Sequence, residues 1–196
     1  MIDERFIILG TIIGFLGSLH YVVDTVKGKV KPNRVSWFMW ALAPLVAFFA
    51  EIQQGVGLHA LLTFSVGFNP LLVFIASFFN KKAQWKITKV DLICGALSLL
   101  GLALWAFTRI GNVAIFFAIL ADGLAAIPTI LKSYKAPETE SWIVFFLGFI
   151  SSGITLLAIK TWDFAHYGFP LYIFAVTAIF VLLIRFKLGK RLSQMF

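Results

Sequence analysis

The amino-acid sequence predicts an all-α membrane protein with seven transmembrane helices. Three features lead to this prediction: the composition, the length of the apolar runs and the placement of the basic residues. Of the 196 residues, 60% are hydrophobic and 13% are charged, whereas an ordinary soluble domain is about 25% charged. A soluble domain of this size would expose large apolar patches, which soluble monomers avoid. A bilayer removes this difficulty because it solvates apolar surface.

Seven apolar runs of 19 to 23 residues follow one another along the chain. About 20 residues, each with a rise of 1.5 Å, are needed to cross a hydrocarbon core of about 30 Å. Each run is therefore long enough for one crossing. The predicted spans are residues 5–26, 35–53, 57–79, 89–108, 112–133, 142–160 and 167–186.

The basic residues gather in alternate loops between these spans. On one side of the predicted membrane lie 14 of the 17 Lys and Arg, while the other side holds Arg5, Arg109 and Lys160. Loops rich in Lys and Arg stay in the cytoplasm, so we expect the N-terminus outside and the C-terminus in the cytoplasm. The same distribution explains the net charge of +8 without a nucleic-acid partner, and it makes membrane lipids the natural contact of these loops. The residues on the basic side are Lys27, Lys29, Lys31, Arg34, Lys81, Lys82, Lys86, Lys89, Lys132, Lys135, Arg185, Lys187, Lys190 and Arg191.

The chain also contains an internal repeat. Residues 27–37 read KGKVKPNRVSW and residues 132–142 read KSYKAPETESW, so that a shift of 105 aligns four identical residues. A second match joins PLLVF at 70–74 to PLYIF at 170–174, at a shift of 100. The four identities pair Lys27 with Lys132, Pro32 with Pro137, Ser36 with Ser141 and Trp37 with Trp142.

This repeat predicts two three-helix units, in residues 1–83 and 111–196, joined by a linker helix in residues 84–110. A three-helix unit begins on one side of the membrane and ends on the other, so a second unit joined directly would be inverted. One additional crossing restores the orientation. The two units are then parallel repeats, related by an axis along the membrane normal.

This plan of three, one and three helices resembles the SWEET sugar transporters and the wider PQ-loop group. The segment IPTILKSYKAPETESW at 127–142 is similar to the family signature, in which a proline, a small polar residue and a basic stretch precede a Ser-rich start of the next helix. Thr129 stands where that signature has glutamine. The resemblance implies transport of a small solute by alternating access, with the helix prolines Pro44 and Pro128 as hinges.

Asp122 is the strongest candidate for a functional residue. It lies ten residues into its predicted span, about 15 Å deep by helical rise. A carboxylate at that depth costs several kcal/mol unless it is paired, hydrated or protonated, and such residues usually mark a transport path or a proton relay. We therefore expect Asp122 to bind the polar part of a substrate or to take up a proton. A structural hydrogen bond to a neighbouring helix is the alternative.

Other polar and aromatic residues near mid-depth extend the predicted substrate site. Asn69 precedes Pro70, which loosens the local helix ladder, and Ser65 lies one turn away on the same face. Trp40 offers a stacking surface or, like Trp37, an interfacial anchor. For the single polar residues, packing between helices is the alternative. The predicted substrate-binding residues are Asp122, Asn69, Ser65, Trp40, Thr177 and Tyr172.

His20 and Asp24 form a separate candidate pair towards the inner end of the first span. At a spacing of four residues they share one helix face, and a His–carboxylate pair can relay protons. The predicted proton-linked residues are therefore Asp122, His20 and Asp24. An interfacial ion pair that caps the cytoplasmic end of the helix is the alternative.

We expect a small-solute transporter for a sugar-like or other small polar metabolite, with proton coupling and a homo-oligomer both left open. The alternative is a membrane receptor that binds a ligand on the same scaffold without transporting it. An enzyme is not expected, because the sequence has no H-E-x-x-H, no G-x-S-x-G and no paired carboxylates. We expect no metal site and no cofactor, and the single cysteine, Cys94, is interpreted as a packing residue.

Overall fold

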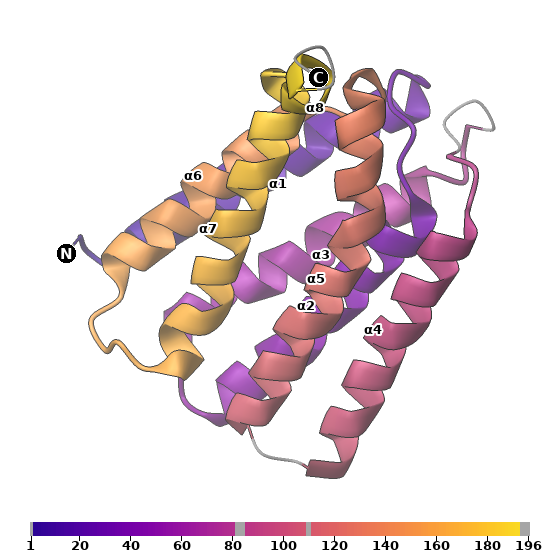
Figure 1. Cartoon of the computed structure of the whole chain (residues 1–196). Coiled ribbons are helices and arrows are strands. Elements are labelled where there is room, and N and C mark those ends of the chain that lie inside the picture. Colours follow the sequence, from indigo (N-terminus) through magenta and orange to yellow (C-terminus); the bar gives the residue numbers. More distant parts are fainter. Residues whose placement is uncertain (1, 81–84, 109–110, 193–196) are drawn as a thin grey trace.

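The computed structural model describes residues 2–80, 85–108 and 111–192, which fold into helices without a strand (Figure 1). Three basic residues used for the predicted orientation, Lys81, Lys82 and Arg109, lie outside the described residues. The long helices are α1 (Phe6–Val26), α2 (Arg34–Gln53), α3 (Ala60–Ala76), α4 (Lys89–Thr108), α5 (Gly111–Lys135), α6 (Trp142–Ala158) and α7 (Phe164–Arg185). The short ones are η1 (Gly57–His59), η2 (Pro137–Thr139) and α8 (Leu188–Leu192).

Each predicted apolar run contains one long helix, so the prediction of helices at these places is confirmed. Five of the helical segments are long and apolar enough to cross a membrane, and α6 is a shorter apolar helix of 17 residues. The five are Phe6–Val26, Arg34–Gln53, Gly57–Ala76, Gly111–Lys135 and Phe164–Arg185. The third predicted run differs most, because it opens with the 3₁₀ turn η1 and its helix ends at Ala76. These helices identify the chain as a multi-pass membrane protein by length and composition.

Polar side chains define where two of the helices begin. The Oδ1 atom of Asn33 accepts hydrogen bonds from the backbone N–H groups of Val35 and Ser36 at 3.1 and 3.4 Å, which caps α2. Asp163 caps α7 by accepting from the backbone N–H of His166 at 3.1 Å. The His166 ring also hydrogen-bonds to this carboxylate at 2.7 Å, and it is the main reason why the pKa of Asp163 lies below its usual value.

The long helices run alternately up and down between the two ends of one bundle (Figure 1). In the first three, α3 packs against both α1 and α2; in the last three, α7 packs against both α5 and α6. Between these groups, α1 packs against α6 and α2 packs against α5. Exchanging α1 with α5, α2 with α6 and α3 with α7 leaves this pattern unchanged. Helix α4 packs outside the pattern, against α5 and α2.

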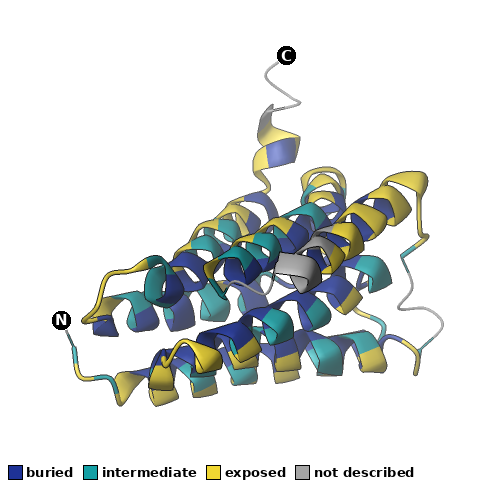
Figure 2. Ribbon diagram, turned by 90° about the horizontal axis from the view of Figure 1, so that it is seen from below, coloured by how far each residue is buried: buried dark blue, intermediate teal, exposed yellow. Residues whose placement is uncertain are grey.

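The outer surface of the bundle is apolar. Figure 2 shows buried residues on the faces that helices turn towards one another and exposed residues on their outer faces. Large apolar side chains lie on those outer faces, including Leu16, Phe49 and Leu157, which are 54%, 62% and 60% exposed. An apolar patch of this extent is rare on a soluble monomer and is the surface that lipid tails require.

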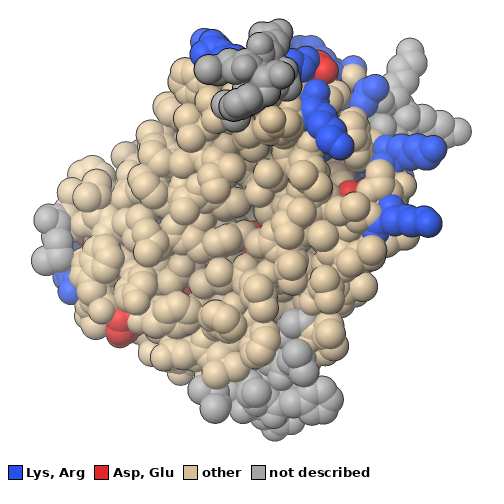
Figure 3. Space-filling view, in the orientation of Figure 1, with Lys and Arg blue, Asp and Glu red and all other residues tan. Residues whose placement is uncertain are grey.

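Charged side chains are concentrated at the ends of the bundle. Figure 3 shows most of the Lys and Arg side chains towards one end, and a body between the ends in which no Lys or Arg and little Asp or Glu is visible. At the opposite end, Lys160 forms an ion pair with Glu4 at 2.6 Å. The N-terminus lies at this less basic end and the C-terminal helix α8 at the basic end. The end of the bundle that contains α8 is called the basic end below.

Glycines bring α1 close to α6. A Cβ atom added at Gly10 would lie 3.2 Å from the backbone oxygen of Ser151, and one at Gly17 would lie 3.0 Å from Cβ of Leu147. Gly14 also meets Ser151, at 3.4 Å. Small residues at such contacts let helix backbones approach each other in a membrane, where dispersion contacts replace the hydrophobic effect as the driving force.

This close contact predicts opposite effects for the same substitution at two glycines. Alanine gains up to about 1 kcal/mol of helix propensity over glycine at either position, but at Gly17 it must displace Leu147, and overpacking costs about 1–3 kcal/mol. Gly17→Ala should therefore melt below the wild type in detergent. Gly123→Ala, whose Cβ would lie 3.8 Å from the ring of Tyr172, should melt at or above it. Equal melting temperatures for the two variants would contradict the tight α1–α6 contact.

Candidate functional site

A cavity of about 110 Å³ lies in the interior of the bundle. Residues of α1, α2, α3, α5, α6 and α7 line it, and no described residue of α4 does. The cavity thus lies between the first three and the last three long helices. Its lining consists of Gly14, Ser18, Trp37, Trp40, Leu62, Ser65, Val66, Asn69, Pro70, Asp122, Val144, Phe145, Gly148, Ser151, Ile173, Val176, Thr177 and Phe180.

Asp122 is the single acidic residue of this lining, and the lining contains no Lys or Arg. The side chain lies near the middle of α5 and the residue is 3% exposed. Its Oδ2 atom accepts a hydrogen bond from the hydroxyl of Tyr172 at 2.6 Å, and its backbone oxygen accepts one from Nε1 of Trp40 at 3.3 Å. Its Oδ1 atom is buried without a hydrogen-bond partner among the described residues. A carboxylate oxygen left in this way is costly to bury and is available to a ligand.

Asn69 supplies a second such oxygen from α3. Its Nδ2 atom donates to Oγ of Ser65, one turn earlier, at 2.9 Å. Its Oδ1 atom is buried and has no partner in the described part of the chain. Pro70, the next residue, lacks a backbone N–H and therefore leaves the carbonyl of Val66 outside the helix ladder. Asn69 and Ser65 thus add polar groups of α3 to the lining.

Aromatic rings form one wall of the cavity. The rings of Phe145 and Phe180 stack with their centroids 4.2 Å apart. Trp40 meets Phe145 edge-on at 6.3 Å and Phe180 edge-on at 5.7 Å. Stacked and edge-to-face aromatic pairs attract each other, and the three rings of this wall come from α2, α6 and α7.

The structure brings the predicted substrate-binding residues together. Asp122, Asn69, Ser65, Trp40 and Thr177 all line the cavity, and Tyr172 is hydrogen-bonded to Asp122. Their role in binding a substrate stays a prediction, because a shared cavity does not identify a ligand. The predicted hinges Pro44 and Pro128 lie inside α2 and α5 and are buried.

His20 and Asp24 lie apart from the cavity, near the basic end of α1. Nε2 of His20 is 3.2 Å from the carboxylate of Asp24, and Lys29 approaches the same carboxylate at 3.6 Å. Because the side chain of His20 is 44% exposed, the pair has the position of an interfacial ion pair. The structure therefore separates these two residues from Asp122, with which the sequence analysis grouped them.

Phe145 and Phe180 are two of the cavity residues that sequence reasoning missed. The shift of 105 that aligns the internal repeat places Phe145 opposite Trp40, so the repeat contained a signal for Phe145. Phe180 is one of 22 phenylalanines, and nothing in its sequence surroundings distinguishes it from those that fill gaps between helices.

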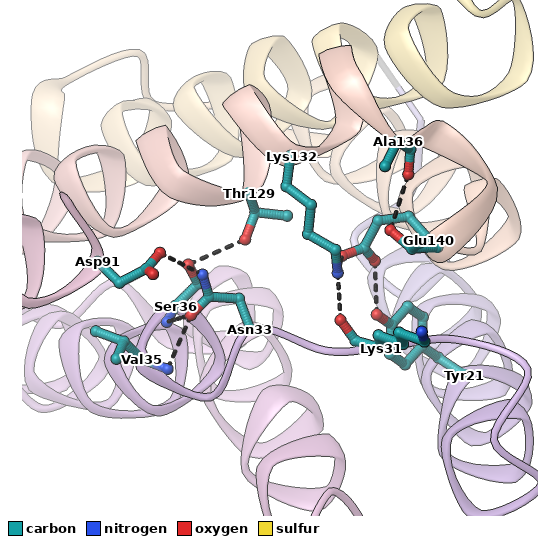
Figure 4. Close-up of polar contacts among 11 residues, drawn as sticks. Tyr21, Lys31, Asn33, Val35, Ser36, Asp91, Thr129, Lys132, Ala136 and Glu140 are labelled. Carbon is teal, nitrogen blue, oxygen red and sulfur yellow. Dashed lines mark hydrogen bonds and ion pairs between the residues drawn. The ribbon is translucent and has the colours of Figure 1, made fainter. Parts of the chain in front are cut away.

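A buried polar network at the basic end was also missed (Figure 4). The carboxylate of Glu140 pairs with Nζ of Lys132 at 2.6 Å and accepts a hydrogen bond from the hydroxyl of Tyr21 at 2.5 Å. Lys132 also donates to the backbone oxygen of Lys31 and lies 4.8 Å from the ring centroid of Trp85. The side chains of Lys132 and Glu140 are 1% and 0% exposed. Sequence reasoning had used Lys132 for the charge bias of the loops and for the internal repeat, without predicting its burial.

Two further contacts of Figure 4 join helices beside this network. The side-chain amide of Asn33 donates to Asp91 of α4 at 2.6 Å, and the hydroxyl of Thr129 donates to that of Ser36 at 3.0 Å. Thr129 therefore connects α5 to α2. Together with the Tyr21–Glu140 and Lys132–Lys31 contacts, this bond joins the first three helices to the last three at the basic end.

A further buried acid lies away from the cavity, near the other end of the bundle. Glu51 of α2 is 1% exposed and accepts a hydrogen bond from Thr63 of α3 at 3.0 Å. It is not part of the cavity lining. No feature of the sequence pointed to its burial.

Comparison of the chain with protein-family models, with curated proteins and with solved structures gave no match. The class of protein therefore follows from the helices, which define a multi-pass membrane protein, and the function is argued from the cavity alone.

The buried network predicts strong coupling between Lys132 and Glu140. Removing one partner of a buried ion pair leaves the other charge uncompensated and typically costs about 3–5 kcal/mol. Lys132→Met and Glu140→Gln should each lower the melting temperature in detergent markedly, and the double variant should recover part of the loss.

The exposed pair Lys160–Glu4 is the matched control. Its side chains are 61% and 38% exposed, and surface ion pairs contribute about 0–1 kcal/mol, so Lys160→Met should have little effect. Additive losses for Lys132 and Glu140 would show that their contact carries no stability of its own.

Proposed function

We propose that this chain is a small-solute transporter that works by alternating access. In this proposal the seven long helices all cross the membrane, and α1–α3 and α5–α7 are parallel units joined by α4. The exchange symmetry of the helix contacts supports this division. The cavity carries the proposal, because six helices of the two units line it and none of the described side chains of α4 does. Sites at the interface of repeats near the membrane midplane are typical of transporters.

The internal repeat supports the same division from the sequence. The matched segments 27–37 and 132–142 contain the starts of α2 and α6, which are equivalent helices under the exchange of units. This arrangement agrees with the plan of the SWEET and PQ-loop transporters, which we propose as the nearest structural type. The concentration of basic residues at the end that contains α8 favours a cytoplasmic C-terminus and an N-terminus outside.

The contacts at the basic end suggest how the cavity is closed on that side. Tyr21–Glu140, Lys132–Lys31 and Ser36–Thr129 each join one proposed unit to the other. Opening the cavity towards the cytoplasm would require these contacts to separate while the contacts within each unit remain. Pro44 and Pro128 interrupt the backbone ladders of α2 and α5, which pack against each other across the interface, and so provide places for bending.

The polar groups of the cavity provide the proposed substrate contacts. Asp122, oriented by Tyr172, and Asn69, oriented by Ser65, each present an unpaired oxygen. Trp40 and Thr177 come from opposite units. A solute held between the units can be released to either side when they rock against each other, so that one site serves both states. Proton uptake by Asp122 remains part of the proposal. The His20–Asp24 pair, which lies apart from the cavity, is the second candidate for proton uptake.

Reconstitution tests the proposal. Purified protein in sealed liposomes should accumulate at least one of a panel of radiolabelled solutes, namely glucose, ribose, glycine and ethanolamine, faster than protein-free liposomes. Because a hydrogen bond to a charged group contributes about 1.5–3 kcal/mol, Asp122→Asn should slow the uptake by at least about tenfold.

Glu51→Gln is the matched control, since it neutralises a buried acid outside the cavity lining, and it should leave uptake unchanged. If a solute bound but did not accumulate in the lumen, the chain would be a receptor and not a transporter. If no solute were bound or accumulated, both forms of the proposal would fail.

A further inference from the structure

The charges around the cavity restrict the solutes it can accept. Its lining contains one acid, Asp122, and no base. The unpaired Oδ1 atoms of Asp122 and Asn69 are both hydrogen-bond acceptors. A carboxylate or phosphate would place negative charge against these oxygens in a site of low dielectric constant, where repulsion is strong. A group with several N–H donors and a positive charge would instead satisfy them.

The aromatic wall favours the same kind of group. Trp40, Phe145 and Phe180 enclose part of the cavity with their rings in contact. The faces of aromatic rings attract cations, most strongly when both are desolvated. Asp122 and this wall line the same small cavity, so an ammonium group inside it has a counter-ion and a π surface within one site.

The size of the cavity limits the solute to a few heavy atoms. Its volume is about 110 Å³, whereas an apolar protein cavity of about 150 Å³ is large enough to hold benzene. The apolar part of the lining, which includes Leu62, Val66 and Ile173, suits a short aliphatic chain. A hexose with many hydroxyl groups would leave most of them without partners against these side chains.

We propose that the cavity binds a small primary ammonium ion, with its charged nitrogen at Oδ1 of Asp122 and its short carbon chain against the apolar lining. This inference rests on the proposed function, since it names the class of solute that the transporter carries. Asp122 is then the counter-ion of the solute, which explains a carboxylate buried in the middle of a helix without a basic partner. Tyr172 holds the carboxylate in position through its other oxygen.

A matched series of probes tests the proposal in detergent, without any need for transport. Propylammonium, propan-1-ol and propionate have nearly the same size and differ in charge. At up to 100 mM and constant ionic strength, propylammonium should raise the melting temperature in a saturable way, and the other two should not. Because this ranking uses the wild-type chain, it does not depend on the folding of any variant.

Two variants locate the effect at the cavity. Asp122→Asn should weaken propylammonium binding at least tenfold, whereas Glu51→Gln, a buried acid outside the lining, should bind it like the wild type. Equal stabilisation by propan-1-ol, or no stabilisation by any probe, would overturn the inference. If liposomes accumulated only a neutral solute, the proposed transport would be supported and the proposed ammonium site would be contradicted. If propylammonium bound but no solute were accumulated, the ammonium site would be supported and transport would be contradicted.

Discussion

The main constraint on this molecule is that hydrocarbon offers no hydrogen bonds, so every polar group between the membrane surfaces must find its partner inside the protein. The backbone meets this requirement by forming helices. The side chains meet it by converging on a few interior places, of which the cavity around Asp122 and the network around Glu140 are the most developed. The remaining outer surface is apolar. The positions of the helices are therefore determined as much by where polar side chains must meet as by apolar packing.

The two halves of the chain meet this constraint in different ways. At the shift that aligns the repeat, Asp122 corresponds to Gly17. Gly17 brings α1 close to α6, whereas Asp122 lies on α5, the helix that packs against α2, and presents a carboxylate to the cavity. The internal symmetry thus describes the backbone arrangement but not the chemistry. Asp122 thus gives the cavity an acidic group that has no counterpart in the first half of the chain, which an exact repeat would not provide.

The fold was predictable where its cause is local. The apolar runs located the seven long helices because the required length and hydropathy are properties of consecutive residues. Asp122 and Asn69 could be selected because polar residues in an apolar run have few harmless positions. Features that depend on contacts between helices were not predictable in the same way. The burial of Phe180 and of Glu51 depends on which helix faces stand opposite each other. The pairing of Lys132 with Glu140 and Tyr21 was hidden for the same reason, because a lysine near a helix end is usually explained by contact with water or lipid headgroups.

The central claim is that two parallel units, joined by one further crossing, enclose the cavity, and an odd number of crossings puts the chain ends on opposite sides of the membrane. Single cysteines introduced at Asp3 and at Arg191, both exposed, in a Cys94→Ala background can be tested with a membrane-impermeant thiol reagent on intact cells and on inverted vesicles. We expect the cysteine at position 3 to react in intact cells and the one at position 191 to react in inverted vesicles. Labelling of both positions from the same side would contradict the arrangement.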